Sequence, residues 1–188
     1  MPTPYPLPHE TMTEHDLRYP IGKFRLEGEV TPERRKGWIA EIEALPGRLR
    51  DAIAGLDDQQ LDTPYRPDGW TVRQVVHHVP DSHLNAYLRF KLALTEDEPT
   101  IKPYLENAWA ELPDTRSTPP DVSLALLKSL HQRWAALMRA MSEADFGRTF
   151  VHPEHGRVFK LDEVLPVYAW HGKHHTAHIT ALRDREGW

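Results

Sequence analysis

Residues 170–178 read Trp170-His171-Gly172-Lys173-His174-His175-Thr176-Ala177-His178, so four histidines fall within eight residues. At about 100° per residue, a helix here projects all four side chains into an arc of about 100°. His171 and His175 are four residues apart, as are His174 and His178, and either pair could bind one metal ion from one helix face. A lone histidine is more often exposed or hydrogen-bonded in a core, but four on one face favour metal binding.

The helix that carries these histidines is predicted to run from about Asp162 to Arg183. Its inward stripe comprises Val164, Tyr168, His171, His175, His178 and Leu182. A bundle helix normally has apolar side chains at such positions. Burying imidazole rings there costs free energy unless they are paired or ligated, which again favours a metal.

The first of three further predicted helices begins at Thr31-Pro32-Glu33, with threonine as the N-cap and proline at the first helical position. Apolar residues then recur at spacings of three and four, as in an amphipathic helix. Pro46-Gly47 predicts a kink or a break near Leu45, and Gly55 is a suitable end.

The second predicted helix opens with a capping box formed by Thr71 and Gln74 and continues to about Leu94. Pro80 either bends this helix or separates two helices, and the continuing apolar pattern favours one bent helix. The third predicted helix covers about Asp121 to Met141.

The remaining segments connect these helices. Residues 95–121 contain five prolines and form a long loop, and residues 148–160 contain two short β-prone runs that predict a small hairpin. Residues 1–20 are rich in proline and polar side chains, which predicts an extended arm. Four helices with these connections indicate an all-α four-helix bundle, in which metal sites form between facing helices.

The overall composition restricts the function. The chain has 188 residues and 23 Lys+Arg against 28 Asp+Glu, a net charge of −5 that argues against nucleic-acid binding. There is no cysteine, so a metal site must use His, Asp or Glu, and thiol chemistry must take its sulfur from another molecule. No apolar run approaches the ~20 residues of a membrane span, and residues 1–17 lack the apolar core of a signal peptide. We therefore expect a cytoplasmic protein that binds no membrane.

A mononuclear zinc-type site needs three protein ligands, one more than a single helix pair supplies. The comparable source is His77-His78 on the second helix, where adjacent side chains point about 100° apart and only one can face the interior. His83 lies about 140° from His78 and is a poor partner. The residues alone thus leave two questions open. One is which of His77 and His78 is a ligand, and the other is which histidine pair of the fourth helix binds the metal.

Longer blocks of sequence carry a family resemblance, and this resemblance answers both questions. They are residues 17–24 (LRYPIGKF), 69–78 (GWTVRQVVHH), 81–85 (DSHLN), 89–92 (RFKL), 101–104 (IKPY), and 168–171 (YAWH) with His174, His175 and residues 177–179 (AHI). In these blocks, residues 18–188 resemble the YfiT branch of the DinB-like superfamily. That branch comprises metal-dependent hydrolases associated with bacillithiol S-transferase activity. The resemblance implies that residues 18–188 form the DinB-like domain and that residues 1–17 are an arm outside it.

The resemblance further implies an up-down-up-down bundle that binds one divalent ion, Zn²⁺ or Ni²⁺, through His78, His171 and His175, and that forms a homodimer. Pro80 departs from the alanine that we expect in relatives. No residue is assigned a catalytic role beyond the metal with its bound water or thiol. The implied function is transfer of a low-molecular-weight thiol, such as bacillithiol, to a small electrophile, with the metal stabilising the thiolate. The alternatives are a hydrolase with metal-bound hydroxide and a non-enzymatic, stress-related metal-binding bundle.

Two residues of the second helix are candidates for substrate binding. With His78 as the reference, Asn85 and Arg89 fall at about 340° and 20°, on the same helix face. Arg89 could bind a carboxylate of an anionic thiol through two parallel hydrogen bonds, or it could form an internal salt bridge. Asn85 could orient a ligand or water, or hydrogen-bond to a facing helix.

Overall fold

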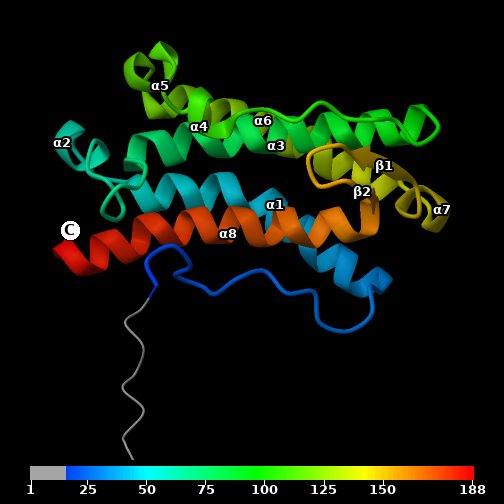
Figure 1. Cartoon of the computed structure of the whole chain (residues 1–188). Helices are drawn as coiled ribbons and strands as arrows, with labels where there is room; N and C mark the ends of the chain where they lie inside the picture. The colour runs from blue at the N-terminus through cyan, green and yellow to red at the C-terminus, as the bar shows by residue number, and fades with distance from the viewer. Residues whose placement is uncertain (1–15) are drawn as a thin grey trace, which may run out of the picture.

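The computed structural model describes residues 16–188, and four long helices form its body (Figure 1). They are α1 (Pro32–Ile53), α3 (Val72–Thr95), α6 (Pro120–Ala140) and α8 (Leu161–Glu186). The predicted four-helix bundle is confirmed. Within residues 16–188, no helix combines the length and apolar character that crossing a membrane requires. The arm predicted for residues 1–17 lies almost entirely outside the described residues, so its boundary with the bundle remains a prediction.

Helices α1 and α8 lie side by side and run in the same direction (Figure 1). Near their N-terminal ends, the Arg35 guanidinium donates to both carboxylate oxygens of Asp162 at 2.6 and 3.0 Å. Near their C-terminal ends, Arg183 Nη1 donates to the carbonyl oxygen of Ala52 at 2.9 Å. Arg35 is buried and also binds Glu143 at 2.5 Å. Because an unpaired buried charge is strongly unfavourable, these contacts favour the parallel arrangement of the two helices.

Helices α3 and α6 form a second parallel pair. Near the start of both helices, His77 Nδ1 lies 2.7 Å from Ser123 Oγ, and further along both, His83 Nδ1 lies 2.9 Å from His131 Nε2. The two pairs run in opposite directions, so the order along the chain is up-down-down-up and the expected up-down-up-down alternation is wrong (Figure 1).

The connection between α3 and α6 gives the physical reason. Parallel neighbours must be joined by a segment that returns along the length of a helix, whereas antiparallel neighbours need only a short loop. Residues 96–119 make this return, and they contain the short helices α4 (Glu106–Trp109) and α5 (Pro113–Ser117). The long loop predicted for residues 95–121 is this crossover.

Local sequence signals act largely as predicted. Thr31 caps α1 by accepting from the backbone N–H of Arg34, and α1 continues through Pro46, so a break near that proline is excluded. The helix ends before Gly55, whose φ of +79° suits glycine. Helix α3 likewise contains Pro80 within one continuous helix, as favoured from its apolar pattern.

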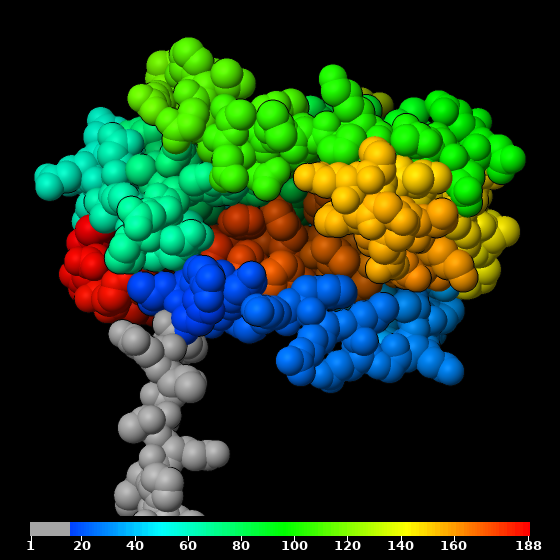
Figure 2. Space-filling view, viewed as in Figure 1, coloured from blue at the N-terminus to red at the C-terminus, as the bar shows by residue number. Residues whose placement is uncertain are grey.

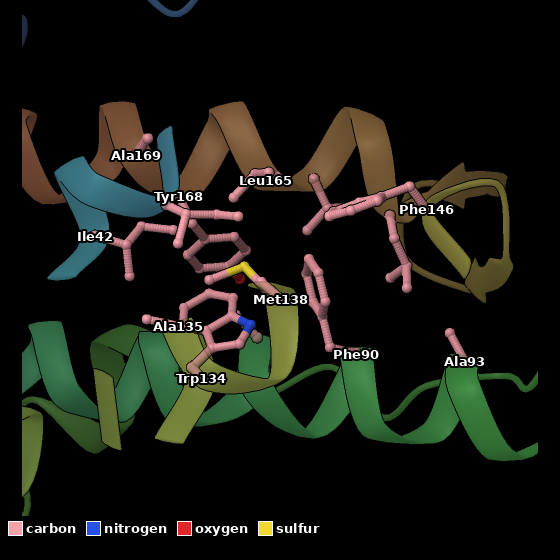
Figure 3. Packing of buried hydrophobic residues seen from close by; sticks show 14 of the residues in the cluster. Ile42, Phe90, Ala93, Trp134, Ala135, Met138, Phe146, Leu165, Tyr168 and Ala169 are labelled. Atoms are coloured by element: carbon pink, nitrogen blue, oxygen red, sulfur yellow. The ribbon is translucent and has the colours of Figure 1, made fainter. Parts of the chain in front are cut away.

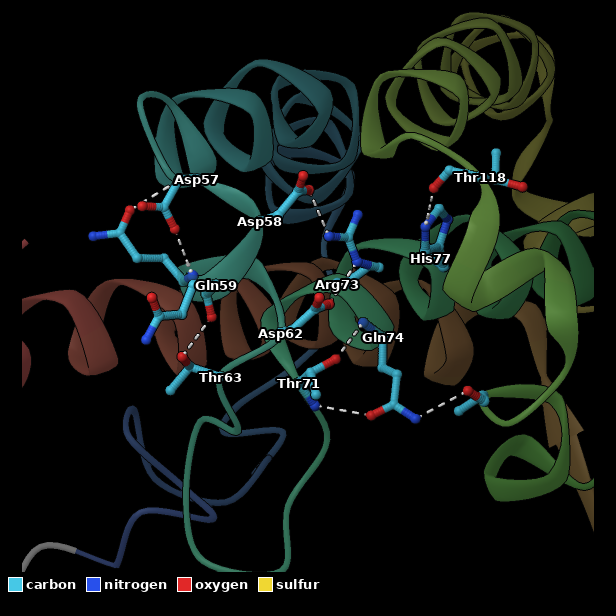
Figure 4. A network of polar contacts seen from close by, with 12 residues as sticks. Asp57, Asp58, Gln59, Asp62, Thr63, Thr71, Arg73, Gln74, His77 and Thr118 are labelled. Atoms are coloured by element: carbon cyan, nitrogen blue, oxygen red, sulfur yellow. Dashed lines mark hydrogen bonds and ion pairs between the residues drawn. The ribbon is translucent and has the colours of Figure 1, made fainter.

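The connector between α1 and α3 is tied to the start of α3 (Figure 4). It contains α2 (Asp58–Leu61). Arg73 donates to Asp62 at 2.7 Å and to Asp58 at 2.8 Å, and Gln74 Nε2 donates to the carbonyl oxygen of Ala110 at 3.0 Å. Gln74 also completes the predicted capping box with Thr71. The start of α3 therefore holds both the connector and the crossover in place.

The predicted hairpin is confirmed, between α6 and α8. It follows α7 (Glu143–Phe146) and pairs β1 (Thr149–His152) with β2 (Arg157–Lys160) in antiparallel register. An apolar cluster fills the bundle at this end, with Trp134 and Phe90 fully buried and Phe146 beside them (Figure 3). A second apolar cluster, which includes Val76, fills the opposite end.

Histidines form a polar layer between these two clusters. Along α6, His131 lies between Leu127 of one cluster and Trp134 of the other. Along α3, His83 lies between Val79 and Ala86 in the same way. The middle of the bundle is therefore the place where polar side chains replace apolar packing.

Candidate metal centre

Three histidines from two antiparallel helices meet near the middle of the bundle. One nitrogen atom each of His78 on α3 and of His171 and His175 on α8 can be chosen so that all three lie within 4.8 Å of one another. Ring centroids are 4.4 Å apart for His171 and His175 and 4.8 Å apart for His78 and His175. These are the three residues predicted as ligands, and the structure brings them together. We call them the histidine triad; that they bind a metal remains a prediction.

The triad provides neutral nitrogen ligands. Burial lowers the pKa of His78 to about 4 and lowers the pKa values of His171 and His175 well below their ordinary value. At neutral pH each ring therefore keeps a lone pair, which is the form that binds a metal.

The fit to a metal rests on the chemistry of the donor set. His175 Nδ1 is buried and has no hydrogen-bond partner within residues 16–188, but the same holds for Nδ1 of His174 and His178, so this feature does not single out the triad. Three neutral imidazoles, with no fourth protein ligand among the described residues, match an open zinc-type site. The donor set therefore fits a divalent ion.

Gly172 fixes which face of α8 points toward α3. A β-carbon at this position would lie 2.4 Å from Cδ2 of the buried Leu45, so any larger residue requires Leu45 or α8 to shift. With Gly172 against α1, the side chains of His171 and His175 project toward His78 on α3. The glycine between the histidines is thus part of how the fold positions the triad.

The other histidine pair of α8 faces a different segment. His178 Nε2 donates to the carbonyl oxygen of Arg18 at 3.1 Å, and its ring stacks on Tyr65 with centroids 4.0 Å apart. The His174 ring stacks on Trp170 with centroids 4.4 Å apart. His174 and His178 therefore pack against the segment before α1 and the connector, not against α3.

Helix α3 carries two further histidines. His77 contacts Ser123 and the carbonyl oxygen of Thr118 and stays outside the triad, as predicted. His83 is not a member of the triad, but its Nε2 lies 3.2 Å from Nδ1 of His171, a contact that sequence reasoning missed.

His131 was missed altogether, although it lies 2.9 Å from His83. Its position in the apolar stripe of α6, between Leu127 and Trp134, was the available signal. A polar residue at such a position needs a partner in the core.

A hollow borders the triad on the side shown in Figure 2, where α8 (orange) forms the floor. The segment before α1 (blue) and the green crossover rise on either side. The part of this face next to His175 encloses about 330 Å³ and is also lined by Trp70, Tyr65, Arg18 and Arg66. Tyr19 and Asp68 line it as well, and the Arg18 guanidinium is already paired with both carboxylate oxygens of Asp16. The Arg66 guanidinium together with the aromatic rings makes this hollow suitable for a partly apolar ligand that carries an anionic group.

A second, larger hollow of about 520 Å³ lies between α3 and the crossover and is lined by Asn85, Arg89, Lys102 and Tyr104, among others. Burial raises the pKa of Tyr104 to about 12, and the Ser82 hydroxyl partly offsets this effect. Ser82 Oγ in turn lies 3.5 Å from Nε2 of His171. This second hollow therefore approaches the triad through Tyr104 and Ser82.

The two predicted substrate residues both line this larger hollow. Asn85 Nδ2 donates to the carbonyl oxygen of Asp81 one turn earlier in α3, at 2.9 Å. Arg89 Nη1 donates to the hydroxyl of Tyr168 at 3.2 Å, and no carboxylate pairs with Arg89 within the described residues. An internal salt bridge is thus not the role of Arg89, and substrate binding remains a prediction.

Comparison with known proteins identifies the family. The chain is 60% identical over 173 residues to a "Putative metal-dependent hydrolase" of Bacillus mycoides strain KBAB4, covering 92% of this chain and 99% of the relative. It is 59% identical over 174 residues to a Bacillus cereus strain 03BB102 protein of the same name, covering 93% and 99%.

Solved structures agree with this result. YfiT from Bacillus subtilis, described as "a probable metal-dependent hydrolase with an unusual four-helix bundle topology", superposes with a TM-score of 0.89 at 49% identity over 92% of this chain and 98% of that one. Mycothiol-dependent maleylpyruvate isomerase shares the fold alone, with a TM-score of 0.62 at 16% identity over 77% and 60% of the two chains. The model of the DinB superfamily matches residues 41–179, and the chain therefore belongs to the DinB superfamily.

Proposed function

We propose that this protein is a metal-dependent transferase that joins a low-molecular-weight thiol, such as bacillithiol, to a small electrophile. The observation that carries the proposal is the pair of hollows at the triad: one contains His175 itself, and the other approaches His171 through Tyr104 and Ser82. A reaction between two substrates needs two adjoining sites, whereas hydrolysis needs only one site and water.

The triad would hold one divalent ion, Zn²⁺ or Ni²⁺, which when bound supplies Lewis acidity that lowers the pKa of a thiol or water. The chain has no cysteine, so the sulfur must come from a second molecule. Arg66 in one hollow, and Arg89 with Lys102 in the other, are suited to bind carboxylates of an anionic thiol. Trp70 packs against both His78 and His175 and limits the access of water to that side.

The relatives support the metal and also supply the alternative. Proteins about 60% identical to this chain are named as metal-dependent hydrolases, which favours metal-dependent hydrolysis as the second candidate. A protein of the same fold is named for its dependence on mycothiol, so the fold is compatible with thiol chemistry. A non-enzymatic metal-binding bundle is the third candidate, and it predicts no turnover at all.

The deciding experiment is metal analysis of the purified protein followed by a conjugation assay. A fluorogenic electrophile is offered with bacillithiol, glutathione, cysteine or coenzyme A in parallel. We expect about one metal ion per chain and turnover with one of these thiols. His171→Ala should abolish turnover, while His77→Ala, at a buried histidine of α3 that lines neither hollow, should retain most of it.

Other outcomes would contradict the proposal. Metal with no thiol turnover, but with ester or amide hydrolysis that His171→Ala abolishes, would establish the hydrolase. Metal with no turnover of either kind would leave the binding bundle, and no metal after reconstitution would refute all three functions. A homodimer also remains a prediction, which light scattering of the eluting protein tests directly.

A further inference from the structure

Three histidines from three helices form one continuous row of hydrogen bonds through the middle of the bundle. His171 Nδ1 on α8 lies 3.2 Å from His83 Nε2 on α3. His83 Nδ1 lies 2.9 Å from His131 Nε2 on α6. His131 Nδ1 lies 2.5 Å from the carbonyl oxygen of Ile42 on α1. Every long helix of the bundle thus contributes one group to this row, which we call the histidine row.

The carbonyl at the end determines the direction of every hydrogen bond in the row. A carbonyl oxygen can only accept, so His131 must carry its proton on Nδ1. A neutral imidazole then has a lone pair on Nε2, and this lone pair must accept from Nδ1–H of His83. The same reasoning gives His83 an accepting Nε2 and gives His171 a proton on Nδ1. One backbone carbonyl therefore selects the tautomer of three side chains in succession.

The surroundings keep the row neutral and rigid. His83 and His131 are 0% and 1% exposed, and no carboxylate hydrogen-bonds to either ring within the described residues. An imidazolium there would be an unpaired buried charge, which is strongly unfavourable. Trp134 packs edge-on against His83, with centroids 5.8 Å apart and planes at 84°. Tyr168 packs against His83 in the same way at 5.3 Å.

The consequence falls on Nε2 of His171. With the proton held on Nδ1, the free lone pair of His171 must be on Nε2, on the side of Ser82 Oγ at 3.5 Å. Metal-binding histidines usually donate their other N–H to a carboxylate, a backbone carbonyl or water, which fixes the ring and strengthens the ligand. Here the Ile42 carbonyl oxygen fixes the His171 ring indirectly, through His131 and His83.

We propose that His83 and His131 are positioning residues that hold His171 in the Nδ1–H tautomer and so present its Nε2 to the metal. This inference rests on the proposed metal site but not on the thiol or on the reaction. The metal-free protein already requires the tautomer. The inference can therefore fail or succeed independently of the proposed function.

The first test is nitrogen-15 NMR of histidine-labelled, metal-free protein at pH 7.5. We expect His83, His131 and His171 all to give the spectral pattern of the Nδ1–H tautomer. An Nε2–H tautomer at His171, or exchange between the two forms, would overturn the proposal. This measurement needs no variant, so it gives a result even if the variants below fail to fold.

The second test compares Zn²⁺ affinity by competition with a chelator. His131→Leu removes the acceptor for His83 while leaving the triad itself intact, and we expect about 10–100-fold weaker binding, the usual effect of losing such support. His131→Gln can keep an acceptor near the position of Nε2 and should recover part of this loss. Folding of each variant is checked by circular dichroism.

His77→Leu is the matched control. His77 is also a buried histidine that connects α3 to α6, but it does not touch the row. We expect its Zn²⁺ affinity to stay within about 3-fold of wild type, well below the effect of a supporting residue. A folded His131→Leu protein that binds Zn²⁺ as tightly as His77→Leu would overturn the positioning role. If wild-type protein binds no Zn²⁺ but shows the three tautomers, the metal site fails while the histidine row stands.

Discussion

The two histidine pairs of α8 have the same spacing on the same helix but different surroundings. His171 and His175 face His78 across an antiparallel contact, and their nitrogen atoms come within reach of one ion. His174 and His178 face Tyr19, Tyr65 and the carbonyl oxygen of Arg18. The comparison shows that helical spacing makes a pair of candidate ligands available, while the neighbouring helix decides which pair is joined by a third histidine.

The largest expected effect separates the two pairs directly. His171→Ala and His175→Ala should each weaken Zn²⁺ binding by more than ~100-fold, because even loss of an indirect support costs about 10–100-fold. His174→Ala and His178→Ala should change it by less than about 5-fold, because neither contributes to the triad. Chelator competition measures all four variants. Similar losses of Zn²⁺ affinity in both pairs would contradict the assignment of the metal to the face of α8 that carries His171 and His175.

The next effect is the pH dependence of stability in the metal-free protein. Burial lowers the pKa values of His78, His131 and His174 to about 4, from about 6.5 in the unfolded chain. Between these values the unfolded state binds more protons, so the stability present above pH 6.5 is lost as the pH falls toward 4. Each histidine contributes at most about 1.4 kcal/mol per pH unit, which urea titrations at several pH values measure.

The His174→Gln variant sharpens the comparison in the same titrations. It should reduce the pH dependence of the free energy of unfolding between pH 6.5 and pH 4, because about one proton fewer is taken up on unfolding. Zn²⁺ affinity should stay nearly unchanged. An unaltered slope would show that His174 does not titrate with a lowered pKa in the folded protein.

A smaller effect is expected from the helix contact that orients the triad. Gly172→Ala should lower the free energy of unfolding by about 1–3 kcal/mol, because its new β-carbon meets Leu45 at van der Waals overlap. It should also weaken Zn²⁺ binding, since rotating α8 moves His171 and His175 away from His78. Urea unfolding and chelator competition measure the two effects.

The double variant G172A/L45A is the control for this contact. Removing the Leu45 side chain should relieve the overlap, so the two substitutions should couple favourably rather than add. Strictly additive losses would show that this contact does not set the position of α8.

The smallest effect concerns the two hollows near the triad. If an anionic thiol lies beside His175, Arg66→Ala should raise its KM by about 2–5-fold, since partly exposed charges contribute ~0.2–1 kcal/mol. If the thiol lies between α3 and the crossover, Arg89→Ala should have this effect instead. Lys128→Ala, an exposed cation on α6, should leave KM unchanged. Equal KM values in all three variants would contradict an electrostatic role for either hollow.

Much of the fold could be predicted because its signals are local. Thr31, Thr71 and Gln74 form their capping hydrogen bonds with residues three positions away, and Gly55 ends α1 through its own backbone conformation. Amphipathic spacing is also a property of one helix at a time. The four helices, their ends and the hairpin accordingly follow from the sequence.

The directions of the helices could not be predicted in the same way. The parallel contact of α1 with α8 depends on Arg35 meeting Asp162, more than a hundred residues away. The crossover could equally have been a surface loop, since its composition is compatible with both. Only the packed bundle shows that it returns along α3 and so permits two parallel pairs.

The same division holds for the candidate site. The sequence alone is sufficient to show that α8 offers histidines on one face, that α3 offers a His-His pair, and that no cysteine competes with them. Periodicity along a helix is sufficient for this, because it requires no knowledge of neighbours. The tertiary structure decided that His78, His171 and His175 converge, and that His83 and His131 connect His171 to the Ile42 carbonyl. These contacts depend on the relative rotation and direction of four helices, which follow from packing across the whole bundle and not from any one segment.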